Sequence, residues 1–133
     1  MNDETTLIYG RIGSDQPFYD LVDAFYQGVE TDLTLRPLYP DNLTDSKKHL
    51  ALFLIQRFGG PTRYGEDRGH PRLRMRHIPF RIGQAESDAW LRHMAAAIEG
   101  TPSFQPFREI LTRYFRESAA FLVNHHEIPA SAE

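Results

Sequence analysis

The chain has 133 residues, a mass of 15.4 kDa and a formal net charge of −3. That length suits one compact domain, and the weakly acidic balance argues against a general attraction to nucleic acid or anionic membranes. Cysteine is absent, which excludes disulfides, thiolate metal sites and cysteine nucleophiles. No apolar run approaches the roughly 18 residues of a membrane span, and no signal pattern opens the chain, so we expect a cytoplasmic protein.

Apolar residues follow helical spacing along most of the chain. One stripe covers residues 18–29, and a second covers 43–53 and ends before Gly59-Gly60-Pro61, residues that stop a helix. Two further stripes cover 90–98 and 104–122. We find no repeat, linker or low-complexity tract. The pattern therefore predicts an all-α fold and a single domain over residues 1–133.

Three segments lack this spacing. Residues 59–70 (GGPTRYGEDRGH) contain four glycines and no apolar period, which predicts a loop. We expect residues 1–11 and 126–133 to be flexible tails.

The central segment Gly69–Ile82 (GHPRLRMRHIPFRI) contains four arginines and two histidines. Strict alternation from Arg72 to His77 is typical of a half-buried strand, but a lone strand would leave its backbone groups unpaired. The alternative is a short helix that starts near Pro71 and ends before Pro79. Both interpretations place His77 on an apolar face.

A histidine on an apolar face has two interpretations. It is most often a core residue that makes one hydrogen bond, but a neutral imidazole there also suits haem iron. A metal shared by His70 and His77 is disfavoured, because no carboxylate or thiol stands at ligand spacing nearby. The arginines are either a solvated face or partners for the two propionates of a porphyrin.

The longer stretch RYGEDRGHPRLRMRHIPFRI, followed by DAWLRHM, closely resembles the truncated haemoglobins of group II, the O type. The upstream motifs FYQGV, RPLYP and LFLIQRFGGP occur in the order found in that family. The resemblance covers about residues 12–124. It implies a two-over-two helical sandwich around one haem b.

The resemblance also implies roles for individual residues. His77 matches the proximal iron ligand, and Trp90, Tyr39 and Tyr26 match the three polar positions that stabilise a ligand on the distal side. Other positions match residues of the haem pocket. Those on the distal and apolar walls are Ser46, Leu50, Phe53, Leu73, Met75 and Phe80, and the candidates for the propionates are Tyr64, His70, Arg74 and His49.

Two of these positions depart from relatives. Ser46 is a small polar residue where some relatives have an apolar one, so it leaves the side entrance wide. His49 stands where some relatives have an arginine, and a histidine is a weaker propionate partner.

By this resemblance the protein binds O2, NO and CO at haem iron and releases O2 slowly, because indole and phenol donors hold the ligand. An enzymatic alternative is NO dioxygenation or a peroxidase-like reaction, with peroxide as a substrate and an unidentified reductase as partner. A remote alternative is a haem-free helical binding module. We expect a monomer or homodimer.

Overall fold

The computed structural model describes residues 4–124, and every regular element in that range is a helix. The α-helices are α1 (Ile8–Ile12), α2 (Gln16–Glu30), α3 (Thr44–Arg57), α4 (Arg63–Arg68), α5 (Leu73–His77), α6 (Gln84–Glu99) and α7 (Arg108–Leu122), and the 3-10 helices are η1 (Glu4–Leu7), η2 (Arg36–Leu38) and η3 (Pro102–Phe107). The all-α prediction is confirmed. None of the helices in this range is long and apolar enough to cross a bilayer.

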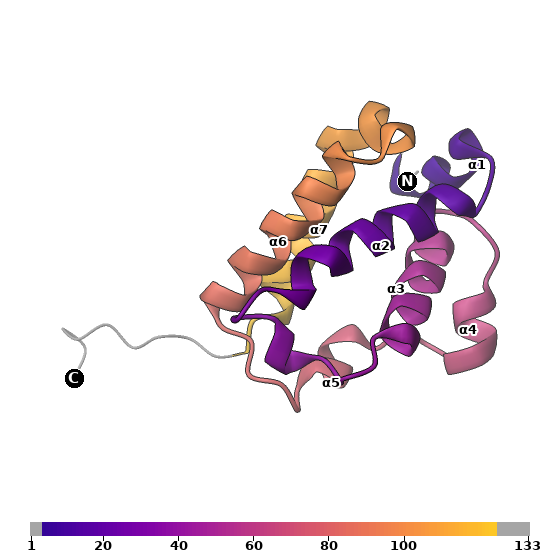
Figure 1. Ribbon diagram of the computed structural model, residues 1–133. Helices are drawn as coiled ribbons and strands as arrows, with labels where there is room; N and C mark the ends of the chain where they lie inside the picture. The colour runs from indigo at the N-terminus through magenta and orange to yellow at the C-terminus, as the bar shows by residue number, and fades with distance from the viewer. Residues whose placement is uncertain (1–3, 125–133) are drawn as a thin grey trace, which may run out of the picture.

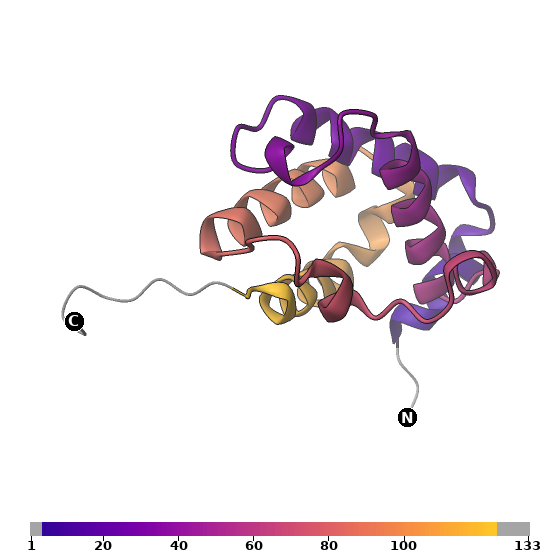
Figure 2. The same ribbon diagram turned by 90° about the horizontal axis from the view of Figure 1, so that it is seen from below.

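Four long helices form the frame. Helix α2 packs against both α3 and α6, and α6 packs against α7 (Figure 1). The pairs α2–α3 and α6–α7 are the two layers of the two-over-two arrangement. The short helix α5 contacts α7 and closes the lower side of the molecule (Figure 2).

Fully buried aromatic residues form the centre of the core. The Phe18 ring makes a T-shaped contact with Phe104, with 5.1 Å between centroids, and its centroid lies 6.4 Å from that of Phe58. These three residues come from α2, η3 and the end of α3, so a single cluster fixes elements that are distant in the sequence.

The predicted N-terminal tail is wrong for residues 4–11, which form η1 and most of α1. Ile8 is fully buried, and the Tyr9 N–H donates to the Phe58 carbonyl at 2.9 Å. Burial of this one apolar side chain and the backbone bond attach the segment to the core. Residues 1–3 and the tail predicted at 126–133 lie outside the described residues.

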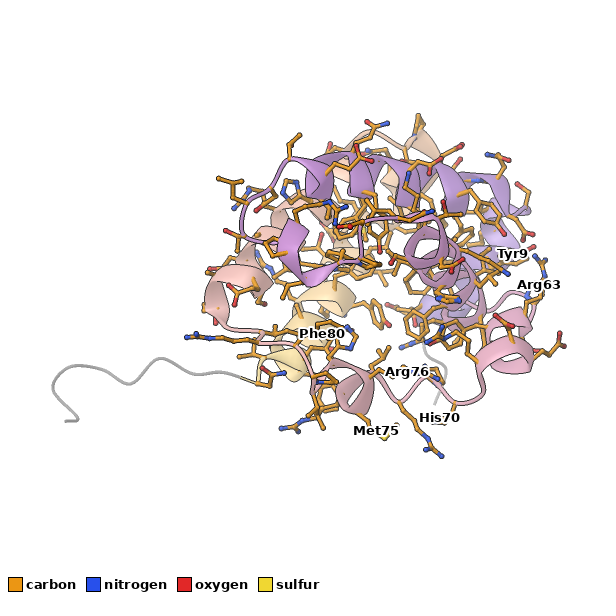
Figure 3. The ribbon with its side chains drawn as sticks, turned by 60° about the horizontal axis from the view of Figure 1, so that its bottom comes forward. Tyr9, Arg63, His70, Met75, Arg76 and Phe80 are labelled. Atoms are coloured by element: carbon orange, nitrogen blue, oxygen red, sulfur yellow. The ribbon has the colours of Figure 1, made fainter. Side chains whose placement is uncertain are left out.

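The loop predicted for residues 59–70 is also partly wrong, because α4 lies inside it. Arg63 forms an ion pair with Asp15 at 2.9 Å, and Asp15 also accepts a hydrogen bond from the Tyr9 hydroxyl at 2.7 Å. Figure 3 shows Tyr9 and Arg63 on the same side of the molecule. The Gly65 N–H donates to the Gln56 side chain at 2.8 Å. Tertiary contacts therefore hold α4 in place. Its sequence has no helical spacing of apolar residues from which the helix could be predicted.

The helical alternative for the central segment is confirmed, and the strand alternative is wrong. Helix α5 spans Leu73–His77, two residues after Pro71 and two before Pro79. The residue that precedes it, Arg72, has a left-handed backbone with φ 45°, a conformation that non-glycine residues adopt at some cost.

Candidate functional site

A cavity of about 380 Å³ lies between the two helix layers and α5. Its volume falls in the range of small-molecule and cofactor sites. Most of the side chains around it are apolar or aromatic, and the polar ones come from α2, α3, α5, α6, α7 and the segments between α2 and α5. The arrangement suits a large, mostly apolar ligand with a few polar contacts.

His77 lies at the end of α5 and lines the cavity, as does Leu73 one helical turn earlier. The His77 Nδ1 atom is 2.6 Å from the Leu73 carbonyl oxygen. Because a carbonyl only accepts, Nδ1 carries the proton, and Nε2 is the nitrogen with a free lone pair. A histidine held this way through one nitrogen is the usual form of a metal-binding histidine.

Three aromatic residues with polar atoms meet at one wall of the cavity: Tyr26 of α2, Tyr39 just after η2, and Trp90 of α6. The Tyr26 and Tyr39 rings are edge to face, with 5.5 Å between centroids. Burial raises the pKa of Tyr26 well above its ordinary value, and the neighbouring Tyr39 adds to this. Burial also raises the pKa of Tyr39, to about 12, against a lowering effect of a hydrogen bond with Trp90.

The direction of that hydrogen bond follows from chemistry. An indole N–H can only donate, so Trp90 donates to the Tyr39 oxygen. The Tyr39 hydroxyl hydrogen then remains to donate to another group. The three residues thus form a set of donors that stay protonated at neutral pH.

Helix α3 supplies the next part of the wall. Ser46, Leu50 and Phe53 are spaced i, i+4 and i+7 on one face of the helix, and all three line the cavity. Phe53 packs edge to face on Tyr64 of α4, with 5.5 Å between centroids. Tyr64, a candidate for the propionates by resemblance, also lines the cavity.

A basic edge of the cavity is formed by Arg68, at the end of α4, and His49 of α3. Arg68 Nη1 lies 2.9 Å from His49 Nδ1 and 3.1 Å from Nε2. Burial and the positive charge of Arg68 lower the pKa of His49, so the imidazole is the neutral acceptor that the guanidinium requires. In the described part of the chain, the Arg68 Nε atom is buried and has no hydrogen-bond partner. An anionic group at this edge would satisfy it.

Three predicted site residues do not reach the cavity. Met75 lies on the outer face of α5, 53% exposed, and points away from the molecule in Figure 3. His70 is exposed and accepts the Arg72 N–H through Nδ1 at 3.1 Å. Arg74 lies over the Phe121 ring, 5.4 Å from its centroid. The helical turn of 100° per residue explains the directions of Arg74 and Met75, since neither lies on the face that Leu73 and His77 share.

Phe80 is 42% exposed, but it lines the cavity (Figure 3). Sequence reasoning missed Arg68 and Arg76, which also line the cavity. Arg68 belongs to the segment that we expected to be a loop, so no period indicated its direction. Arg76 precedes His77 in α5, and its guanidinium folds back onto the carbonyls of Pro71 and Arg68 at 2.8 and 2.9 Å.

Comparison with known proteins gives a consistent result. The family model of the bacterial-like globins matches residues 7–124. The group 2 truncated hemoglobin YjbI of Bacillus subtilis is 38% identical over 119 residues, which cover 90% of this chain and 89% of that protein.

Solved structures show the same likeness. The hemoglobin of the thermophilic phototroph Chloroflexus aurantiacus superposes with a TM-score of 0.85 at 50% identity, covering 89% of this chain and 98% of that one. The truncated oxygen-avid haemoglobin of Bacillus subtilis superposes with a TM-score of 0.82 at 38% identity, covering 88% and 98%. The group II truncated hemoglobin of Bacillus anthracis superposes with a TM-score of 0.86 at 35% identity, covering 93% and 95%.

Proposed function

The chain is a haem-binding globin of the bacterial-like family, a group II truncated haemoglobin, and from this premise we propose that it holds O2 tightly and releases it slowly. In this proposal one haem b occupies the cavity with His77 as its proximal ligand. Tyr26, Tyr39 and Trp90 then stabilise O2, NO or CO on the other side. Haem supplies an iron whose remaining position binds diatomic ligands.

The residues around the cavity fit this cofactor. His77 presents a lone pair on Nε2, because Nδ1 is engaged by the Leu73 carbonyl at 2.6 Å. The Arg68 Nε atom, which is buried and has no hydrogen-bond partner among residues 4–124, fits an anionic substituent of the porphyrin edge, a propionate. The apolar side chains of Leu50, Phe53 and Leu73 fit the porphyrin faces. We therefore assign Arg68 to propionate binding, in addition to Tyr64 and His49.

The proposal of slow O2 release rests on one observation: Tyr26, Tyr39 and Trp90 lie together at one wall of the cavity. Their raised tyrosine pKa values keep both hydroxyls protonated, and the indole can only donate. A diatomic ligand that gains partial negative charge is stabilised by the two hydroxyl donors, of which Tyr39 is held by the Trp90 N–H, and it leaves only when these bonds break. The description of the Bacillus subtilis relative as oxygen-avid agrees with this proposal.

Stopped-flow measurement of O2 release from the haem-loaded protein tests the proposal. Replacing Trp90 with Phe removes one donor and keeps the aromatic bulk. A hydrogen bond is worth about 1 kcal/mol, so release should accelerate roughly five- to tenfold. Tyr19→Phe is the matched control, because Tyr19 packs against the core and does not line the cavity.

Two outcomes would contradict the proposal. A chain that takes up no hemin contradicts the haem site, and fast release that is unchanged in Trp90→Phe contradicts the donor network. Consumption of NO and peroxide in the same preparation, with a reductant present, tests the enzymatic alternative. The reductase, the cytoplasmic location and the monomeric or dimeric state stay predictions.

A further inference from the structure

Helix α5 presents His77 but has little to hold it in place. It has five residues, and none of them is buried. A helix this short is not stable by itself, because too few hydrogen bonds offset the cost of nucleation. Its direction must therefore be set by contacts outside the helix. In its middle Arg74 lies over the Phe121 ring of α7, 5.4 Å from its centroid, and hydrogen bonds hold its two ends.

The N-terminal end is held by α5's own Arg76. Its Nε atom donates to the Pro71 carbonyl at 2.8 Å, and Nη2 donates to the Arg68 carbonyl at 2.9 Å. These bonds tie the helix to the segment that precedes it. They do not tie it to the frame of long helices.

The C-terminal end is held by Asn124, which follows α7. The Asn124 Nδ2 atom donates to the carbonyls of His77, at 3.1 Å, and Phe80, at 2.8 Å. Its Oδ1 atom accepts the Ile82 N–H at 2.9 Å, and its backbone N–H donates to the Ile82 carbonyl at 2.9 Å. One residue thus makes four hydrogen bonds to the turn after α5, and Figure 2 shows that turn beside the end of α7.

The turn needs a partner of this kind. The last carbonyls of a helix have no donors within it, and Pro79 cannot donate because it has no N–H. The His77 carbonyl receives the Phe80 N–H at 3.0 Å, but that bond stays inside the turn. Among the hydrogen bonds of this turn, those of Asn124 connect it to a long helix.

We propose that Asn124 is a positioning residue for the proximal ligand, and that its side-chain donors fix the orientation of His77 relative to the long helices. The inference rests on the proposed function, since it takes His77 as the iron ligand. Asn124 is itself exposed, so its bonds contribute little to the core. Its effect is local to the iron–histidine bond.

The test compares Asn124→Ala and Asn124→Asp with wild type and with Asn42→Ala. Asn42 is the matched control, because its Oδ1 atom accepts one backbone N–H, from Thr44 at 2.9 Å, in a loop far along the chain from α5. Asp at position 124 keeps the acceptor for Ile82 and loses both donors. The readouts are the iron–histidine stretching band in the resonance Raman spectrum of the ferrous protein and the rate of haem loss to an apoglobin acceptor.

Both Asn124 variants should shift or broaden the band and lose haem about fivefold faster, the effect of one or two hydrogen bonds. Asn42→Ala should match wild type in both readouts. Asn124 variants with the wild-type band and wild-type haem loss would overturn the inference, whatever their thermal stability. If wild type itself binds no hemin or shows no iron–histidine band, the proposed function fails and the inference fails with it.

Discussion

Tyr39 combines two properties that a ligand-stabilising hydroxyl needs. It accepts from Trp90, which orients the oxygen, and its burial raises the pKa to about 12, which keeps the hydrogen in place. A tyrosine at its ordinary pKa of 10 would also be protonated at neutral pH. The raised pKa matters in alkaline solution, because the stabilisation that depends on the protonated hydroxyl is lost as the pH rises.

The pH dependence of unfolding tests this property. The folded pKa is higher than the unfolded one, so the stabilisation is fully present below pH 10 and is lost as the pH rises toward about 12. The difference corresponds to roughly 3 kcal/mol at most. Tyr39→Phe should make the urea midpoint less dependent on pH between 9 and 11, in the same direction as Tyr26→Phe. An unchanged pH slope in Tyr39→Phe would contradict a buried, protonated hydroxyl.

At the scale of elements, the crossing of α2 and α6 depends on Gly28. A Cβ atom there would lie 2.9 Å from His93 Cγ and closer still to Nδ1. With no Cβ, His93 stays against α2 and donates through Nε2 to Asp32 at 2.6 Å. Asp32 also accepts the N–H groups of Thr34 and Leu35 at 2.8 and 3.2 Å, and the bond from His93 lowers its pKa. The end of α2, the turn toward Tyr39 and helix α6 are therefore connected.

Gly28→Ala should destabilise the protein, although alanine is the better helix former. The added methyl displaces His93 from Asp32, and overpacking of this kind costs about 1–3 kcal/mol. Gly10→Ala in α1 is the control, because no atom of residues 4–124 outside that helix lies within 4 Å of its added Cβ. That variant should gain roughly 0.5–1 kcal/mol. Urea unfolding of the two variants measures the change in the free energy of unfolding, which should be negative for Gly28→Ala and positive for Gly10→Ala. A stabilised Gly28→Ala would show that the contact between α2 and α6 accommodates a methyl group.

At the scale of the whole molecule, the centre of the core and the cavity are separate. Phe104 is fully buried in the cluster with Phe18, and neither residue lines the cavity. Phe53 lines the cavity and packs on Tyr64. Phe18 and Phe104 therefore contribute to the core without forming the cavity wall, whereas Tyr26 and Phe115 belong to both.

Phe104→Ala should lower the free energy of unfolding by about 3–5 kcal/mol and leave O2 release unchanged. Phe53→Ala should instead accelerate haem loss, because it removes an aromatic ring that lines the cavity. Denaturant unfolding measures the free energy of unfolding of both variants, and stopped-flow mixing measures their rates of O2 release. A changed O2 release in Phe104→Ala would contradict the separation.

The sequence predicts the long helices well, because their apolar period is imposed by the core that they share. It also predicts α5, through Pro71 and Pro79, and a face common to Leu73 and His77. It fails for Arg68, since α4 is held by contacts with distant residues and has no period of its own.

Asn124 lies beyond what sequence pattern can find. Its partners are 42 to 47 residues away, and nothing in its neighbours marks it. Met75 and Arg74 were predicted at the site but lie outside the cavity. A family motif identifies a helix, but it does not tell which of its residues face the ligand. Their directions follow from the helical turn only once its start is known.

The absence of buried residues in α5 has a consequence for the order in which the protein is assembled. The aromatic cluster of Phe18, Phe58 and Phe104 is complete without any residue of that helix. A newly made chain can therefore complete this core without α5 and without haem. The amount of folded protein in a cell would then follow synthesis of the chain, while the fraction able to bind gas would follow the supply of haem.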